Sequence, residues 1–225
     1  FAPDRAAVKG VPTVGEVITA ASRSADIGAN TLRGYVICFR KLAADAYGIR
    51  SDAGRFYHAG AALAKWRKRV DSIRLDKLTP KRIQAALDRR IDAAKGNPLA
   101  ERKARITAAS TLRQAKALFA PDRKLPFEKL PNPFDGVTVN AGTPPKYVST
   151  VKAGDLMRAA KAELATDKPE AYKAFLLALG AGLRANEIDN LQWQQIDGTA
   201  NTIRVMTTAT FETKTDSSER EVFVD

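Results

Sequence analysis

The sequence contains a single cysteine, Cys38, and a single histidine, His58. An intrachain disulfide needs two cysteines, and a structural zinc site needs several Cys or His ligands, so both are excluded and we expect neither a metal nor another cofactor. Long apolar runs are missing too. The longest, from Ala174 to Leu183, is much shorter than the roughly 20 residues that span a bilayer. No signal-peptide pattern follows Phe1, where the chain begins without methionine, so we expect a trimmed form of a cytoplasmic protein with no membrane partner.

Negative charge is scarce relative to positive charge. Lys and Arg number 37 against 25 Asp and Glu, which gives a net charge of +12 and a pI of about 9.9. The hydrophobic share of 44% and the charged share of 28% are otherwise ordinary for a globular chain. A surplus of positive charge attracts polyanions, and nucleic acid is the usual partner of such a protein. Membrane surfaces are the alternative, but no basic amphipathic anchor stands out.

The first half of the chain has the patterns of amphipathic helices. The capping box Thr13-x-x-Glu16 predicts a helix that starts near Val14. Apolar residues at spacings of three and four predict further helices from Thr31 to Ala43, over 59–70, from Pro80 to Gly96, and over about 99–119. In the last of these, the residues predicted to face inward are Ile106, Leu112, Ala115 and Phe119.

Basic side chains crowd the outer faces of these helices. One such residue by itself indicates no more than a solvated helix face. As a set they predict contacts to DNA phosphates, which give salt-sensitive affinity that is independent of base sequence. The predicted DNA-binding residues are Arg33, Arg40, Lys41, Lys65, Arg67, Lys68, Arg69, Arg102, Lys103, Arg105, Arg113 and Lys116.

Between Pro121 and Pro145 six prolines interrupt the chain and no helical period remains. This pattern predicts an extended linker between two domains, 1–142 and 143–225. In the second domain we expect helices from Ala153 to Leu164 and from Pro169 to Leu179, the latter buried. Alternating residues then predict strands over 202–207 and 220–224, joined through Lys214 to Ser218.

A charged pair, Arg184 and Glu187, follows directly after the apolar helix that stops at Gly180 and Gly182. An unpaired buried charge costs several kcal/mol, so this pair either faces a polar cleft or is neutralised inside. The spacing predicts a second helix here, and one face of it is formed by Arg184, Glu187, Ile188 and Leu191. We expect Trp193 and Ile196 to anchor the end of this helix.

The pattern Gly-Leu-Arg184-x-x-Glu187-x-x-x-Leu191-x-Trp193-x-x-Ile-Asp resembles the first active-site box of the tyrosine recombinase (phage integrase) family. Downstream, Thr-Lys214-Thr followed by Arg220-Glu-Val-Phe-Val resembles that family's hairpin, which carries an active-site lysine. The resemblance implies a mainly α fold: an N-terminal helical bundle (SAM-like core-binding domain) joined to the start of an α+β catalytic domain with a small antiparallel sheet. It also implies DNA integration or recombination by a bacterial or phage-encoded, nucleoid-associated enzyme of a mobile element, assembled as a homotetramer on double-stranded DNA when full length.

The resemblance also implies roles for three residues. Arg184, whose planar guanidinium fork can hold two oxygens, would bind the scissile phosphate and stabilise the pentacoordinate transition state. Glu187 would orient it, and Lys214 would protonate the departing 5′ oxygen as a general acid. The plainer alternatives are a helix-capping arginine paired with Glu187, a surface acid, and a solvent-facing lysine in a turn.

The sequence departs from the family pattern after the hairpin. The family's His-x-x-Arg box, a later His or Trp and the tyrosine nucleophile all follow the hairpin, whereas this sequence stops at Asp225 and its tyrosines all precede Arg184. We therefore expect this chain to bind DNA without cutting it, while its full-length parent forms a phosphotyrosine link to DNA. Two alternatives stay open: a catalytically inert DNA-binding regulatory protein derived from a recombinase, and an RNA-binding helical module in which the Arg184 box is coincidental.

Overall fold

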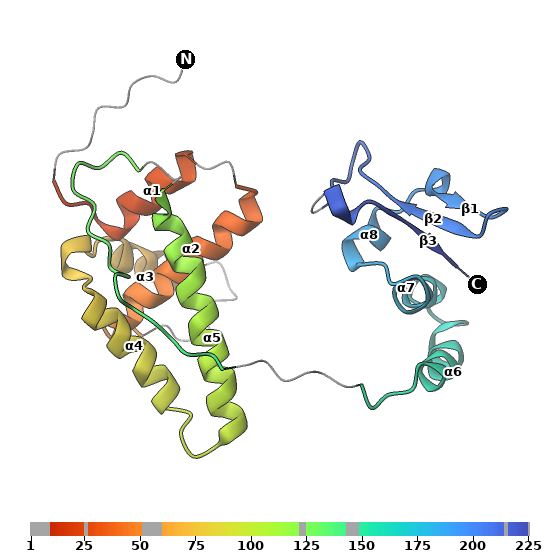
Figure 1. Cartoon of the computed structure of the whole chain (residues 1–225), viewed down its shortest axis with the longest axis horizontal. Coiled ribbons are helices and arrows are strands. Elements are labelled where there is room, and N and C mark those ends of the chain that lie inside the picture. The colour runs from red at the N-terminus through yellow and green to blue at the C-terminus, as the bar shows by residue number, and fades with distance from the viewer. Residues whose placement is uncertain are drawn as a thin grey trace. The chain divides into compact units, whose positions relative to one another are not determined.

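The structure is a computed structural model that describes residues 10–24, 27–50, 60–121, 125–142, 149–213 and 216–224. The chain divides into two compact units, Phe1–Pro145 and Lys146–Asp225 (Figure 1). Two residues singled out from the sequence, His58 and Lys214, lie outside the described residues.

The first unit is helical. Its elements are α1 (Val14–Ser24), α2 (Ala29–Ala46), α3 (Ala61–Asp71), the 3₁₀ turn η2 (Leu75–Lys77), α4 (Pro80–Asp92), α5 (Pro98–Lys116) and the 3₁₀ turn η3 (Ala117–Phe119).

Two predicted helix starts of this unit, those of α1 and α4, are confirmed, whereas α2 begins at Ala29, two residues before the predicted Thr31. The carboxylate of Glu16 accepts the backbone N–H of Thr13 at 2.7 Å, which completes the capping box of α1. The side chain of Thr79 accepts the N–H of Arg82 at the start of α4. Local sequence therefore decides where these helices begin.

Helix α2 lies at the centre of the first unit, packed against α4 and α5. The core contains three phenylalanines in mutual edge-to-face contact, Phe39, Phe119 and Phe134, with ring centroids 5.3 to 5.9 Å apart. One predicted core residue is wrong, because Ile106 is exposed. The inward face of α5 carries Ala108, Leu112 and Ala115, and a residue two positions before Ala108 lies nearly on the opposite side of the helix.

The proline-rich segment, predicted as an extended linker, packs against the first unit over much of its length. Phe134 and Val137 lie fully buried in the first core, and more residues of 125–139 pack against it. Lys116 donates a hydrogen bond from Nζ to the carbonyl of Val137 at 2.8 Å, and the N–H of Thr138 donates to Gln84. We call residues 125–139 the strap, because they bind back onto α4 and α5 as part of the first unit.

The second unit combines helices with a small sheet. Its elements are α6 (Ala153–Leu164), α7 (Pro169–Gly180), α8 (Ala185–Asp189), the 3₁₀ turn η5 (Trp193–Gln195), β1 (Ile196–Asp197), β2 (Thr202–Val205), the 3₁₀ turn η6 (Asp216–Ser218) and β3 (Arg220–Phe223).

The three strands of the second unit are antiparallel and follow the order β1-β2-β3. Ile196 pairs with Ile203, which in turn pairs with Val222. The predicted fold class, mainly α with a small antiparallel sheet, is confirmed. The two-residue strand β1 was not predicted.

Three expectations about the second unit are wrong. Helix α7 has no fully buried residue; it packs mainly against α6 and α8, and its Leu177 reaches the small core only in part. Helix α8 ends at Asp189, short of Leu191. Trp193 does not anchor that helix, since 88% of its surface is exposed, and Ile196 is exposed as well. The core here is small and centres on Ala181, Leu183, Ile203 and Val205.

Across the described residues, the helices are too short or too polar to be membrane spans.

Candidate active site and nucleic-acid interface

A tight turn between α7 and α8 places Arg184. Gly182 has a φ of +64°, a left-handed conformation that glycine adopts at little cost. The N–H of Leu183 donates back to the carbonyl of Leu177 at 3.2 Å, and the side chain of Leu183 is buried in the small core. The next residue, Arg184, has extended backbone and is the N-cap of α8. The buried leucine thus fixes the arginine at the mouth of the helix.

Glu187 lies one turn further along, with only 6% of its side chain exposed. Its carboxylate accepts the backbone N–H of Arg184 at 2.9 Å and the Nη1 of Arg184 at 2.7 Å. Two hydrogen bonds thus join Arg184 to Glu187, a pairing that fits both the predicted supporting role and the plainer alternative of a helix-capping arginine.

Arg220, at the start of β3, binds the same carboxylate from the other side. Its Nη1 donates to Oε1 of Glu187 at 3.1 Å and its Nη2 donates to Oε2 at 2.8 Å, the two-pronged geometry that guanidinium and carboxylate favour. Nη1 also donates to the carbonyl of Ser218, and Nη2 to that of Gly182. Two arginines, 36 positions apart in the sequence, thus share one buried acid.

The sequence pattern places Arg220 in the hairpin, and Arg220 is not among the predicted site residues. A signal was present: Arg220 alternates with Val222 and Val224, so all three fall on the same face of the strand. A charge on the inward face of a strand needs a partner.

The hydrogen bonds from Arg220 are the largest cause that lowers the pKa of Glu187, which falls from 4.5 to about 2 despite the opposing effect of burial. The backbone and side-chain hydrogen bonds from Arg184 lower it further. In return, Glu187 raises the pKa of Arg220. The site therefore keeps two positive charges and one negative charge across the whole working pH range.

The side chain of Arg184 is 63% exposed. Within the described part of the chain, its guanidinium makes one hydrogen bond, from Nη1 to Glu187. An arginine side chain carries five N–H groups, so four remain for a ligand in solvent. A fixed, exposed and permanently charged fork is suited to binding two oxygens of a phosphate.

The hairpin between β2 and β3 is described as far as Thr213. The N–H of Thr207 donates to Glu219 at 2.9 Å, and that of Thr213 donates to the hydroxyl of Thr207 at 3.4 Å. These bonds join the two sides of the hairpin. Because Lys214 lies outside the described residues, its role as general acid stays a prediction.

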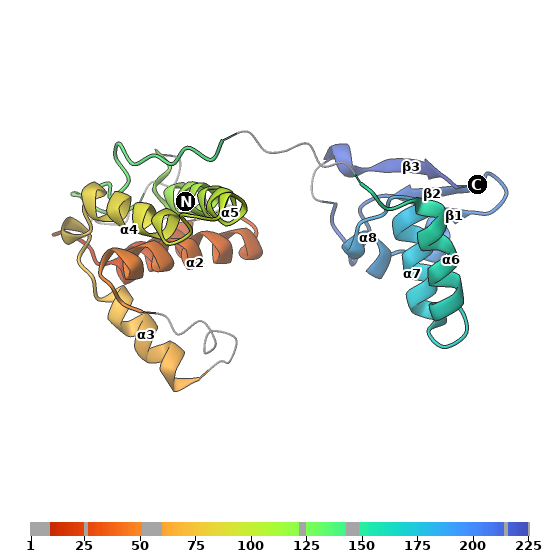
Figure 2. The same ribbon diagram turned by 90° about the horizontal axis from the view of Figure 1, so that it is seen from below.

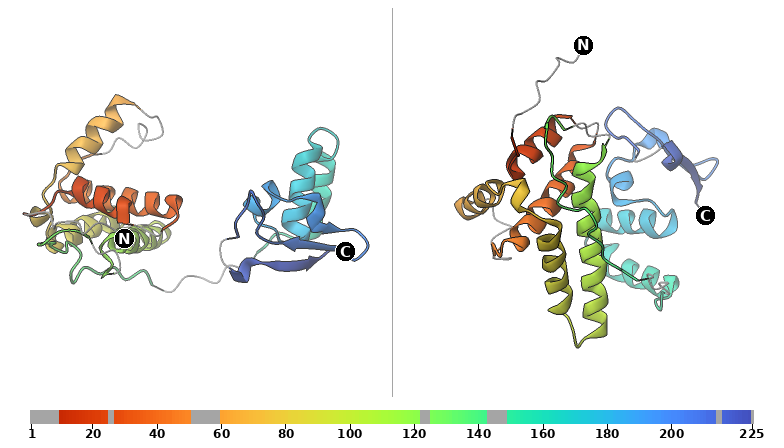
Figure 3. Two further views of the ribbon diagram at one scale, coloured as in Figure 1. Left: turned by 90° about the horizontal axis from the view of Figure 1, so that it is seen from above. Right: turned by 60° about the vertical axis from the view of Figure 1, so that its left-hand side comes forward.

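Four of the predicted DNA-binding residues lie on α3. Lys65, Arg67, Lys68 and Arg69 are all exposed, and we call them the α3 cations. Figure 2 and the left panel of Figure 3 show α3 projecting from the group formed by α2, α4 and α5. No ion pair is present at any of the four among the described residues.

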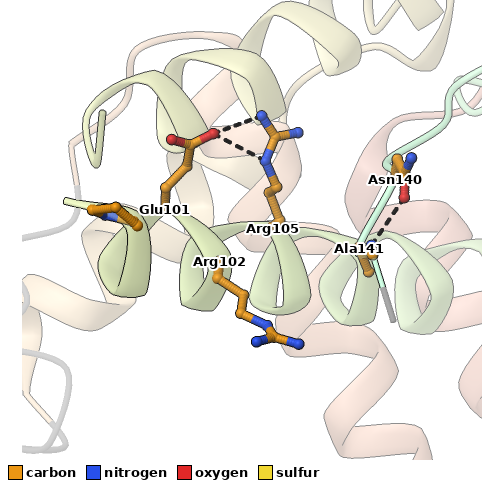
Figure 4. A pocket seen from close by; sticks show the side chains of 7 residues that line it. Glu101, Arg102, Arg105, Asn140 and Ala141 are labelled. Atoms are coloured by element: carbon orange, nitrogen blue, oxygen red, sulfur yellow. Dashed lines mark hydrogen bonds and ion pairs between the residues drawn. The ribbon is translucent and has the colours of Figure 1, made fainter. Parts of the chain in front are cut away.

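Three other predicted DNA-binding residues are held by the protein itself. Arg40 makes two 2.8 Å hydrogen bonds to Asp71 and so ties α2 to the end of α3. Arg105 is paired with Glu101 at 2.7 Å (Figure 4), and Lys116 holds the strap. These residues are less available to a phosphate than the α3 cations.

The remaining members of the predicted set divide by exposure. Arg102 is partly buried and lines a pocket of about 480 Å³ together with Arg105 and Asn140, between the start of α5 and residues 140–142 (Figure 4). The exposed members are Arg33, Lys41, Lys103 and Arg113. A search of the described ranges finds no group of three or more His, Cys, Asp or Glu side chains that could hold a metal ion.

The chain is similar to the Tn1549 transposon integrase. The structure of that integrase in complex with transposon right end DNA matches this chain with 16% identity and a TM-score of 0.49, over 95% of this chain and 61% of the integrase chain. Two structures of the same integrase with circular intermediate DNA match with 14% and 16% identity and TM-scores of 0.48. This chain therefore spans about three fifths of the length of the structures it matches. No protein-family model and no curated protein matches the chain.

The buried carboxylate predicts how the second unit responds to acid. Because its folded-state pKa of about 2 lies below the ordinary 4.5, Glu187 stabilises the fold above pH 4.5, and this contribution disappears as pH falls from 4.5 to 2. We expect Glu187→Gln to lower the free energy of unfolding by about 2 kcal/mol at pH 7, less than the full shift implies because solvent screens the exposed Arg184.

Urea unfolding at several pH values, followed through the amides of β2, measures this effect. The wild type should lose stability more steeply than the variant between pH 4.5 and 2, so that the two curves converge. Parallel curves would show that Glu187 is not ionised at low pH in the folded protein. Glu163→Gln, which changes an exposed acid on α6, is the control.

Proposed function

We propose that this chain is the DNA-binding part of a tyrosine recombinase, in which Arg184 grips a backbone phosphate of double-stranded DNA at the site of strand exchange. The observation that carries the proposal is Arg184 itself: it is exposed, yet held at the mouth of α8 by a buried carboxylate. The Arg184 box and the hairpin motif, which resemble the recombinase family, support the same function.

In this proposal the two parts of the chain have different tasks. The SAM-like core-binding domain, 1–142, supplies sequence-independent phosphate contacts through its exposed cations, above all those on α3. The part that begins at 143 supplies the phosphate-binding arginine and, on the hairpin, the general acid Lys214. Strand cleavage by a tyrosine and assembly as a tetramer belong to the longer protein of a mobile element. That longer protein would be cytoplasmic and associated with the nucleoid.

Chemically, Arg184 contributes binding and charge stabilisation. When a nucleophile attacks a phosphodiester, negative charge builds on the non-bridging oxygens, and a prepositioned guanidinium stabilises that charge without reorganising. Glu187 would be a poor direct contact because like charges repel, so its task is to hold the arginine. No metal or nucleotide is required for this arrangement to act.

The substitution Arg184→Ala tests the proposal in the chain as it stands. Each phosphate that a protein neutralises contributes about 0.9 to the slope of log K against log salt concentration. We expect the variant to lose affinity for duplex DNA and to show a slope smaller by roughly one. Fluorescence anisotropy with a labelled duplex over a salt series measures both quantities.

The matched control is Arg158→Ala, which removes an exposed arginine of α6 that is paired with Asp155. It should leave the slope nearly unchanged. Equal slopes for Arg184→Ala and wild type would overturn the proposal. Competition between duplex DNA and structured RNA addresses the alternative of an RNA-binding module, and tighter binding of RNA would favour that alternative.

A further inference from the structure

We propose that Arg220 is a positioning residue of this site: it anchors Glu187 and the hairpin around Arg184, and it leaves Arg184 its positive charge for the phosphate. The inference rests on the proposed function, because it concerns the same phosphate-binding site. Its evidence is independent of the motif, since the sequence pattern gives Arg220 no such task.

The hydrogen bonds of the two arginines divide them by role. Arg220 donates four bonds, two to Glu187 and one each to the carbonyls of Ser218 and Gly182. Four of the five N–H groups of an arginine are then committed to the protein. Arg184 commits one and is twice as exposed, with 63% of its side chain in solvent against 31% for Arg220. Arg184 therefore faces the ligand, and Arg220 faces the protein.

Charge gives Arg220 its first effect. Arg184 paired with Glu187 alone is electrically neutral and offers little attraction to a phosphate. With Arg220 bound to the same carboxylate, the three side chains together carry a net charge of +1. The most exposed positive charge of the three is that of Arg184. Oε1 of Glu187 accepts from both guanidiniums, at 2.7 Å and 3.1 Å. Glu187 can then orient Arg184 without cancelling its charge.

Connectivity gives Arg220 its second effect. It lies on β3, two residues after Ser218 of η6, so it belongs to the hairpin that carries the predicted general acid. Its Nη2 donates to the carbonyl of Gly182 at 3.4 Å, in the turn that precedes Arg184. One side chain therefore bonds to the hairpin, to the turn and to Glu187. We expect it to fix the hairpin relative to Arg184, as catalysis with two groups on separate segments requires.

The test compares Arg220→Gln and Arg220→Lys in the 225-residue chain. With glutamine in place of arginine, the pKa of Glu187 should rise from about 2 by roughly one unit or more, since the largest cause of its lowering is lost. The NMR signal of the Nε–H group of Arg184 should shift or broaden, because the side chain is no longer held in one orientation. Affinity for duplex DNA should fall several-fold. Lysine restores the charge without the two-pronged geometry, so it should recover part of the affinity while the Arg184 signal stays altered.

Carbon-13 NMR of labelled glutamate carboxyls measures the pKa, nitrogen-15 NMR of arginine side chains reports on Arg184, and anisotropy gives the affinity. The control is Arg204→Gln on the neighbouring strand β2, where Arg204 pairs with Glu221 instead. It removes an equal charge from the same sheet and should leave Glu187 and Arg184 unchanged. Unshifted β2 amides would show that each variant is folded; if the glutamine variant unfolds, the lysine variant carries the comparison of Arg184 signals.

The results separate the inference from the function on which it rests. A pKa of Glu187 that stays near 2 in Arg220→Gln, or an Arg184 signal that does not change, would overturn the positioning role even if Arg184 binds DNA. An affinity loss no larger than that of Arg204→Gln would reduce Arg220 to a contributor of net charge, and also overturn it. Should Arg184→Ala bind DNA as tightly as wild type while the NMR shifts occur as expected, the proposed function fails and the anchoring of Glu187 stands.

Discussion

Replacing the α3 cations, Lys65, Arg67, Lys68 and Arg69, together with glutamine lowers the affinity of the chain for duplex DNA on the order of a hundredfold to a thousandfold at about 0.15 M salt. The salt slope falls by roughly two to four, according to how many of the four contact phosphates. Of the effects on binding expected for this protein, this is the largest.

The reason lies in the geometry of α3. The helix projects from the first unit, to which its C-terminal end is anchored by Val70; its four cations are exposed, and no acid pairs with them among the described residues. Arg40, by contrast, forms an ion pair with Asp71. A cation that is already paired with a carboxylate neutralises a phosphate less well and releases fewer counterions from the DNA. The unpaired cations of α3 should therefore dominate the salt-dependent affinity.

A control with an equal change in net charge separates local contact from general attraction. Lys77, Lys81, Lys95 and Lys129 are exposed elsewhere in the first unit, and their combined replacement by glutamine removes four charges as well. We expect this control to lose much less affinity and slope than the α3 variant. If both variants bind alike over a salt series, the surface that contacts DNA lies elsewhere or the attraction is diffuse. Circular dichroism verifies that the helices persist in both variants. We expect α3 to persist because Val70, which anchors it, is unchanged.

Much of the fold follows from local signals in the sequence. The capping box at Thr13 and the N-cap at Thr79 mark helix starts because a side-chain oxygen there replaces a missing backbone acceptor, an effect that depends on four neighbouring residues only. The alternation of 202–207 and 220–224 likewise located two strands. Such features are readable because their partners lie close in sequence.

The features that sequence analysis missed depend on distant partners. Trp193 fits the apolar pattern of an anchor, but it is exposed because α8 ends at Asp189, before the pattern does. Arg220 reaches Glu187 across 33 positions, and no spacing rule connects a strand residue with a helix start at that distance. The Arg184 box could be recognised as a motif, whereas the partner of Arg220 could be found only in three dimensions.

The packing of the strap on the first core was not predicted, for a related reason. Prolines exclude a helix, and the apolar residues between them, such as Phe127, Leu130 and Phe134, follow neither a helical nor a strand period. Periodicity detects burial only in regular elements. A segment held by single side chains in separate sites gives no periodic signal, although it belongs to the core.

Replacing Phe134 of the strap with alanine therefore lowers the free energy of unfolding of the first unit by about 3–5 kcal/mol, the usual cost of removing a buried phenylalanine ring. The ring is 2% exposed and lies 5.9 Å from that of Phe39 and 5.3 Å from that of Phe119. Small domains have only about 5–15 kcal/mol in total, so the loss is a large part of the stability of this unit.

Urea unfolding followed by Trp66 fluorescence measures the change. A Trp193→Phe background leaves Trp66 of the first unit as the only indole, because the chain has two tryptophans. Phe223→Ala is the matched control: it removes the same ring from an exposed position on β3 and should cost little. If residues 125–139 were a free linker, Phe134→Ala would be as mild as Phe223→Ala. A large difference makes the strap a structural part of the first unit.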